Sequence, residues 1–290
     1  MRKLDDMNPL ALTVYILLVS GVSLVTMNPM LLLCSLLCGM LCFSVQYTAG
    51  RLKMHGFSIV MFAVIALINP LVSHKGMTVL LIINDNPITL EALYYGITAA
   101  LMILSVLYWF RIYTLLMTSD KLLYVFGSIS PKFGLMVSMT LRYIPLFAQQ
   151  AERIAEAQKA VGLFKEDNIV DTVKGKLRVF SVMVTWTLEN GIITADSMAA
   201  RGYGTGKRSR FRIFKWKKSD ALFLAVSMLL FAIAVWAFGG NDTVFYPAFE
   251  MPKMSLAPAL GYASYALLAL LPLIAEGKEA ILWKLQMSRI

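Results

Sequence analysis

The sequence predicts an all-α, polytopic integral membrane protein. Of its 290 residues, 58% are hydrophobic and only 15% are charged, whereas soluble domains carry about 25% charged residues. Apolar runs of roughly 20 residues, the length a helix needs to cross a bilayer, recur along the chain. Six such spans are predicted, at residues 9–27, 29–47, 57–73, 90–110, 221–239 and 257–275. Soluble protein classes are therefore excluded.

The first two spans are separated only by Asn28-Pro29, a strong turn signal. A single helix over both would be far too long for one crossing, so we expect a tight pair of helices. The first span lacks a small-residue cleavage site and a second span follows at once, which argues against a signal peptide.

The distribution of Lys and Arg predicts the orientation. With six spans and both termini in the cytoplasm, 25 of the 27 basic residues fall on the inner side, as the positive-inside rule requires. Residues 111–220 hold 18 of them against 9 acids. In a membrane protein such a basic segment reflects topology and anionic lipid more often than nucleic acid, and no nucleic-acid partner is expected. Three domains are predicted: four spans in 1–110, a cytoplasmic helical segment in 111–220, and two spans in 221–290.

The spans offer little for chemistry inside the membrane. Glu91, at the start of the fourth span, is their only ionisable residue among Asp, Glu, Lys, Arg and His. Ion-coupled carriers and enzymes that work within the bilayer usually need such groups. His55 and His74 are expected in loops on opposite sides, so they cannot share a site. No catalytic residue, metal site or cofactor is predicted.

Two motifs in the sequence are candidates for binding sites. Cys34, Cys38 and Cys42 share one helix face, where a thiolate metal site is one interpretation and small packing residues are the favoured one. The glycine-rich run at 202–207 resembles a phosphate loop, but its spacing fails and Arg208 follows Lys207. Any ATP is expected to be hydrolysed by another subunit.

Outside the spans, further elements are predicted. A β-favouring run and a turn cluster at 78–89 indicate a small hairpin on the outer face. Residues 111–130 are expected along the inner interface, with a short helix capped at Thr118-Ser119-Asp120. A long helix should start at Pro131, break or bend at Pro145 and reach about Gly162. A charged linker over 165–176 should precede a second long helix over 177–201.

Both long helices end on small residues and glycine. The two ends read Ala160-Val161-Gly162 and Ala200-Arg201-Gly202, and Gly202 is placed to end its helix in a left-handed conformation. Arg201 admits two interpretations. It is a cation at the negative pole of the helix dipole, or a bidentate donor presented to an acidic groove on a partner.

Four stretches, in order, make the chain resemble the transmembrane T component of energy-coupling factor (ECF) transporters, a family that includes cobalt-transport permeases. They are Asn-Pro-Leu-Val-Ser-His-Lys-Gly at 69–76, Thr-Ser-Asp-Lys at 118–121, Ser-Met-Thr-Leu-Arg-Tyr-Ile-Pro at 138–145, and Ala-Ala-Arg-Gly-Tyr-Gly at 199–204. The likeness covers nearly the whole chain, and Arg-Tyr-Ile-Pro and Ala-Arg-Gly are its specific parts.

The resemblance implies a non-enzymatic subunit of an ATP-driven importer for a vitamin or for a metal ion such as cobalt, in a bacterial or archaeal cell membrane. Its partners would be two ATP-binding-cassette ATPases, or one ATPase with two halves, and a substrate-binding S component. An Ala-Arg-Gly tip on each coupling helix would contact the ATPases. These tips fall on Ala160, Val161 and Gly162, and on Ala200, Arg201 and Gly202.

The first tip departs from the family pattern because Val161 replaces the arginine, so its contact would be weaker, apolar, or supplied by Lys159. The region 133–147 would contact the S component. The residues assigned to that contact are Met136, Met139, Arg142, Tyr143, Pro145 and Phe147. Two alternatives stay open: a self-contained channel or carrier, and a membrane enzyme or scaffold that holds anionic lipid with its basic segment.

Overall fold

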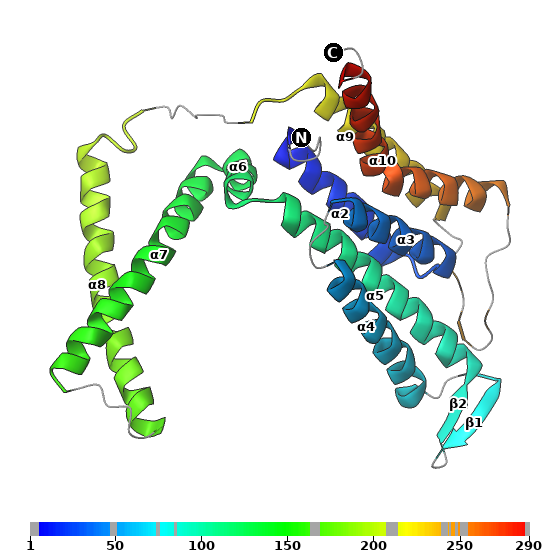
Figure 1. Cartoon of the computed structure of the whole chain (residues 1–290), viewed down its shortest axis with the longest axis horizontal. Helices are drawn as coiled ribbons and strands as arrows, with labels where there is room; N and C mark the ends of the chain where they lie inside the picture. The colour runs from blue at the N-terminus through cyan, green and yellow to red at the C-terminus, as the bar shows by residue number, and fades with distance from the viewer. Residues whose placement is uncertain are drawn as a thin grey trace. The chain divides into compact units, whose positions relative to one another are not determined.

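The computed structural model describes residues 6–46, 51–73, 76–83, 86–162, 169–206, 214–238, 243, 245–246, 249 and 255–287, most of them helical (Figure 1). The chain forms two compact units. We call residues 1–122 with 214–290 the bundle unit, and residues 123–213 the crossed-helix unit. Each is described by itself.

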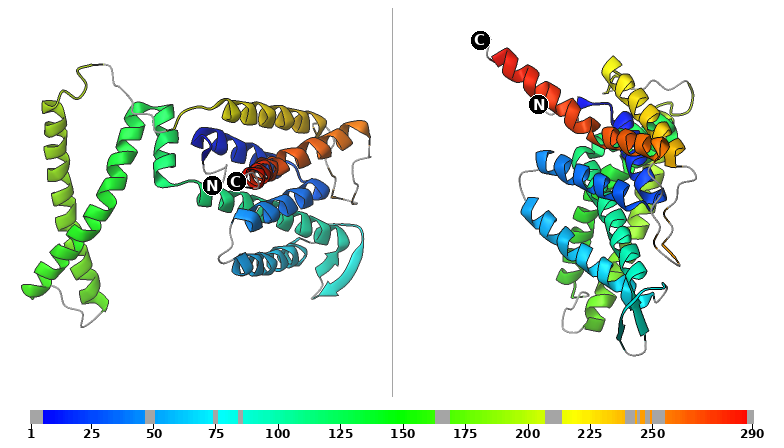
Figure 2. Two further views of the ribbon diagram at one scale, coloured as in Figure 1. Left: turned by 45° about the horizontal axis from the view of Figure 1, so that its top comes forward. Right: turned by 90° about the vertical axis from the view of Figure 1, so that its right-hand side faces the viewer.

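In its described residues, the bundle unit contains six helices. They are α2 (Pro9–Val25), α3 (Pro29–Gln46), α4 (Arg51–Val72), α5 (Leu90–Leu116), α9 (Lys218–Phe238) and α10 (Leu256–Met287). Helix α5 packs against α2, α3 and α4, while α9 packs on α10 and α2, and α10 also contacts α3 (Figure 2). Among the described residues, α3, α4, α5, α9 and the first 20 residues of α10 are long and apolar enough to cross a membrane, and α2 is a shorter apolar helix. The predicted all-α membrane class is confirmed.

An asparagine side chain caps the start of each of the first two helices. The Asn8 side-chain oxygen accepts a hydrogen bond from the Leu10 amide (3.0 Å), and that of Asn28 accepts one from the Met30 amide (3.2 Å). In each case proline follows at the first helical position, where its missing N–H costs nothing. The predicted turn at Asn28-Pro29 is therefore confirmed.

The helical boundaries depart from the predicted spans at their polar ends. Helix α5 continues through Arg111 to Leu116, beyond the predicted end at residue 110. Helix α4 begins at Arg51, so the prediction that His55 lies in a loop was wrong. The two ring nitrogens of His55 contact the Tyr108 hydroxyl (2.8 Å) and the Ser44 hydroxyl (3.2 Å). His74 lies outside the described residues. Hydropathy identifies only the apolar part of a helix, whereas the backbone hydrogen bonds of the helix continue into its polar ends. The predicted spans are therefore shorter than the helices.

A buried polar cluster joins four helices of the bundle. The Ser35 hydroxyl on α3 lies 3.0 Å from that of Ser23 on α2, and accepts hydrogen bonds from Tyr265 on α10 (2.8 Å) and Trp109 on α5 (3.1 Å). All four side chains are fully buried. Hydrogen bonds between membrane helices specify which faces meet, so this cluster fixes the arrangement of α2, α3, α5 and α10.

The predicted hairpin is confirmed. Strands β1 (Val79–Ile83) and β2 (Asn86–Thr89) pair antiparallel, with Val79 opposite Thr89. At their base the Thr78 hydroxyl donates to the buried Glu91 carboxylate (2.7 Å). The single acid of the predicted spans therefore anchors the hairpin to α5.

The crossed-helix unit contains α7 (Pro131–Ala160) and α8 (Ile169–Ala200), preceded by α6 (Ser119–Ile129), which begins in the bundle unit. The predicted start at Pro131 and the short preceding helix are confirmed. Of the predicted break or bend at Pro145, the break was wrong, because α7 runs through this exposed proline as one helix, and the bend stays a prediction. The predicted linker over 165–176 was wrong from residue 169 onward, because α8 already begins at Ile169. Charged side chains suggested a linker there, but they are equally compatible with the exposed surface of a helix.

Glycines form the corner between α6 and α7. A Cβ added to Gly134 would lie 2.6 Å from the Gly127 Cα, so no side chain fits between the two helices. Phe126 and Phe133 pack edge to face beside them, with ring centroids 5.4 Å apart. This close contact fixes the angle at which α7 leaves α6.

Candidate coupling site

Helix α8 ends in a motif that satisfies its last carbonyl groups. Gly202 has φ +76°, as predicted, and its amide donates to the Ala199 carbonyl (2.9 Å), while the Tyr203 amide donates to that of Met198 (3.0 Å). These two bonds define a Schellman motif. Because only glycine adopts this conformation without strain, Gly202 fixes where α8 stops.

Helix α7 ends in the same way. Val161 closes the helix, with its amide donating to the Ala157 carbonyl (3.2 Å), and Gly162 follows with φ +74°. The Gly162 amide donates to the Lys159 carbonyl (3.0 Å), which matches the bond at Gly202. The two tips share their backbone geometry over the described residues.

Both tips face solvent. Val161 is 73% exposed, and Arg201 is also exposed. Lys159, Ala160 and Ala200 lie on exposed surface too. The tips therefore present one cationic and one apolar side chain on otherwise equivalent helix ends.

Aromatic and hydroxyl contacts fix the point where α7 and α8 cross. The Tyr143 hydroxyl lies 2.9 Å from that of Thr194, and the rings of Phe147 and Trp186 meet edge to face at 5.8 Å. Tyr143 stacks on Phe147 one turn along α7 (5.5 Å). Trp186 and Thr194 were not identified from the sequence, although the four-residue spacing of Tyr143 and Phe147 marks the α7 face that meets them.

The two helices run antiparallel, so Gly162 and Gly202 lie at opposite ends of the crossed pair (Figure 1). At 1.5 Å per residue, Ala160 lies about 20 Å beyond Phe147, and Ala200 about 21 Å beyond Trp186. Both helices therefore extend well beyond the Phe147–Trp186 contact toward their tips.

The residues predicted to contact an S component fall into two groups. Met136 (63% exposed), Arg142 and Pro145 lie on the surface of α7. Tyr143 and Phe147 are half-buried in the crossing with α8, and Met139 is half-buried as well. The structure therefore gives Tyr143 and Phe147 a role in holding the two helices together.

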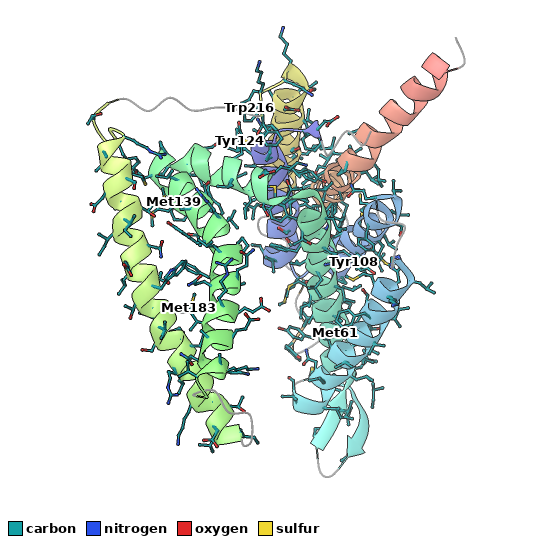
Figure 3. The ribbon with its side chains drawn as sticks, turned by 60° about the vertical axis from the view of Figure 1, so that its left-hand side comes forward. Met61, Tyr108, Tyr124, Met139, Met183 and Trp216 are labelled. Carbon is teal, nitrogen blue, oxygen red and sulfur yellow. The ribbon has the colours of Figure 1, made fainter. Side chains whose placement is uncertain are left out.

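An apolar groove of about 560 Å³ lies between α7 and α8 on the Gly162 side of the crossing. Phe147 and Ala151 line it from α7, and Val179, Phe180 and Met183 line it from α8 (Figure 3 labels Met183). Phe180 is 65% exposed. A water-facing surface this apolar is typical of an interaction site.

The cysteines form no ligand set in the described structure. Cys38 and Cys42 are buried and Cys34 is half-buried, all three as free thiols. Among the described residues, no three His, Cys, Asp or Glu side chains are placed to hold a metal ion. These cysteines pack inside the bundle, as the favoured interpretation predicted.

The sequence model of the cobalt transport protein family, CbiQ, matches residues 2–213. The chain belongs to this family. The matched region contains α7 and α8 with both tips, together with the first four helices of the bundle. The resemblance predicted from the four short stretches is confirmed.

Curated relatives carry a consistent name. The chain is 36% identical over 101 residues to the energy-coupling factor transporter transmembrane protein EcfT 1 of Listeria monocytogenes. It is 32% identical over 101 residues to the protein EcfT of Streptococcus equi, and 32% over 117 residues to that of Streptococcus thermophilus. The alignments cover 34, 34 and 38% of this chain, and 38, 38 and 44% of the relatives. The chain thus spans less than half the length of the relatives it matches.

Proposed function

We propose that this chain is the transmembrane coupling subunit of an ATP-driven, energy-coupling factor importer. Its partners are two ATP-binding-cassette ATPases, or one with two halves, and a membrane S component that binds a vitamin or a metal ion. The chain lies in a bacterial cell membrane with both termini in the cytoplasm. Residues 111–220 are its coupling domain, between four spans in 1–110 and two in 221–290.

The equivalence of the two exposed helix ends is the observation that supports this proposal best. Gly162 and Gly202 have the same left-handed backbone, and the tips they define stand at opposite ends of a crossed, antiparallel pair (Figure 1). A two-site attachment to a paired ATPase needs two such ends. Neither a channel nor a lipid-binding scaffold requires them.

Arg201 is the docking group at the α8 tip. Its guanidinium presents five donors in a planar fork that matches a carboxylate on an ATPase. At a helix carboxyl terminus the same cation is stabilised by only about 0.3 to 1 kcal/mol when exposed. Docking to a carboxylate therefore gives Arg201 a larger role than this small gain in helix stability.

Force is transmitted through the crossing. When the ATPases close, the tips move, and a pair held by Tyr143, Thr194, Phe147 and Trp186 transmits that movement as a rigid body. The exposed part of α7, with Met136, Arg142 and Pro145, contacts the S component, assisted by Met139. Tyr143 and Phe147 support this surface from the crossing.

Arg201→Glu tests the proposal. Cutting one partner from a desolvated charge pair typically costs 2 to 5 kcal/mol, so we expect recovery of the co-expressed ATPases with this chain to fall at least tenfold. Arg153→Glu is the matched control, because Arg153 is also exposed and lies away from either tip on α7. Equal ATPase recovery with wild type and Arg201→Glu would overturn the docking role of Arg201.

Val161→Arg tests the α7 tip. Since Val161 cannot donate to a carboxylate, we propose that this tip makes an apolar contact or relies on the exposed Lys159, and that the two ATPase positions are bound unequally. An arginine at 161 should increase ATPase retention by several-fold in a salt titration of the immobilised complex. A drop in ATPase retention would show that the ATPase binds Val161 in an apolar pocket, so that this tip makes an apolar contact. Unchanged retention would show that Val161 makes no contact.

A further inference from the structure

The cations of the bundle unit gather at one end. The Thr243 hydroxyl, beyond α9, donates to the Met27 carbonyl (2.5 Å), so the end of α9 lies beside the α2–α3 turn. The Ser44 contact with His55 places the opposite end of α3 beside the start of α4. Each Lys or Arg that the structure describes in this unit lies at that second end, which also holds the start of α9. Those whose side chains the structure describes are Lys53, Arg111, Lys121, Lys215, Lys217 and Lys218.

The other end carries aromatic rings. Tyr94 stacks on Phe249 (4.8 Å), and Tyr95 packs against Phe245 (5.4 Å) and Tyr246 (6.0 Å). Tyrosine-rich belts mark the level where a membrane meets water. The basic end therefore lies at the level of the opposite headgroups.

The start of α9 is the most concentrated part of the basic end. Lys215, Trp216, Lys217 and Lys218 are all exposed, and Trp216 is 46% exposed. The nearest acid, Asp220, is buried (2% exposed), and its carboxylate accepts a hydrogen bond from the Lys217 amide (3.2 Å). Asp220 thus closes the first turn of α9 in the manner of a capping box, and its carboxylate is buried whereas the three lysines are exposed.

Helix stability does not explain three lysines at this position. The start of a helix is its positive pole, where cations are unfavourable and anions favourable. Helix α9 has 21 residues, about 31 Å of rise, which matches the roughly 30 Å hydrocarbon core. The lysines and the Trp216 indole are consequently held at the phosphate level of the bilayer.

We propose that residues Lys215–Lys218 form a binding site for anionic phospholipid headgroups. The ammonium groups pair with lipid phosphates and acidic headgroups, and the Trp216 indole lies among the glycerol and acyl-chain boundary. This site holds the start of α9 at a fixed depth. The inference does not depend on ATPase coupling: Lys215–Lys218 fall at the end of the proposed coupling domain, 111–220, but in the structure they belong to the bundle unit.

The test measures how strongly the purified full chain prefers anionic over zwitterionic lipid, in nanodiscs that contain spin-labelled phosphatidylglycerol or phosphatidylcholine. Wild type is expected to bind phosphatidylglycerol in preference. Lys215→Gln/Lys217→Gln should lower this preference at least fivefold, since each surface lysine contributes about a fivefold gain toward anionic lipid. The matched control Arg153→Gln/Lys174→Gln removes two exposed cations from α7 and α8. Lys215→Arg/Lys217→Arg should keep the preference.

Three outcomes would overturn the proposal. The first is a preference that the Gln variant leaves unchanged, and the second is an equal loss in the matched control. The third is retained lipid preference with reduced ATPase recovery, which would assign the segment to a protein partner. Matching thermal midpoints of the Gln and Arg variants confirm that folding is unaffected.

Discussion

Trp186→Ala is expected to reduce ATP-driven uptake at least tenfold while the ATPases stay bound. The variant removes the edge-to-face contact with Phe147 at the crossing of α7 and α8. Such a contact contributes about 0.5 to 1.5 kcal/mol beyond the area it buries, and the apolar groove beside it would widen. Both tips would keep their geometry, because Gly162 and Gly202 are remote from the crossing along each helix. Movement at one tip would then no longer reach the other arm.

Uptake per ATP hydrolysed, measured in proteoliposomes with the complete complex, reports this uncoupling. Trp236→Ala is the matched control, because Trp236 is 73% exposed on α9 and its loss disturbs no crossing. Tyr143→Phe and Thr194→Val remove the 2.9 Å hydroxyl contact without changing volume much, and we expect a smaller effect of the same kind. Normal uptake with Trp186→Ala would show that the crossing need not be rigid. Loss of ATPase binding would show that the variant had damaged the tips instead.

Gly96→Ala should destabilise the bundle unit. A Cβ at Gly96 on α5 would lie 2.7 Å from the Ala66 carbonyl oxygen and 3.0 Å from the Asn69 Cβ, both on α4. Since a backbone carbonyl cannot rotate away as a side chain does, α4 must move. Overpacking of this kind costs about 1 to 3 kcal/mol, and small residues are what allow membrane helices to approach so closely.

Thermal unfolding of the purified chain in detergent checks this expectation, with a midpoint several degrees below wild type. Gly56→Ala is the matched control, for which the midpoint should stay the same or rise. Nothing lies within 4 Å of a Cβ at Gly56 on α4, so alanine there should be neutral or add up to about 1 kcal/mol through helix propensity. A Gly96→Ala midpoint at or above wild type would mean that α4 and α5 do not approach as closely as described.

The likeness to the cobalt transport protein family bears directly on the two tips. The family model spans both of them, yet only the second keeps Ala-Arg-Gly in this chain. Structurally the two ends match, with glycine φ angles of +74° and +76°. The two tips therefore differ in chemistry, with Val161 at one and Arg201 at the other, but not in backbone shape, and for that reason Val161→Arg is an informative exchange.

Several features of this protein could be predicted from the sequence alone. Membrane insertion depends on windows of about 20 apolar residues, so the spans, the turn at Asn28-Pro29 and the all-α class follow from local composition. The ends of α7 and α8 are similarly local. A glycine after a helical run sets its own backbone, and both Gly162 and Gly202 could be identified without any partner in view.

Only the tertiary structure decided which side chains meet. His55 pairs with Tyr108, which lies 53 residues away, and Tyr143 with Thr194, which lies 51 residues away. Hydropathy and spacing describe one helix at a time, so they placed His55 in a loop and did not reveal that Tyr143 and Phe147 pack against α8. The crossing of α7 and α8 depends on the phase of one helix face against another. The sequence determined where the two exposed tips end, and the packing at Phe147 and Trp186 decided that they belong to one crossed pair.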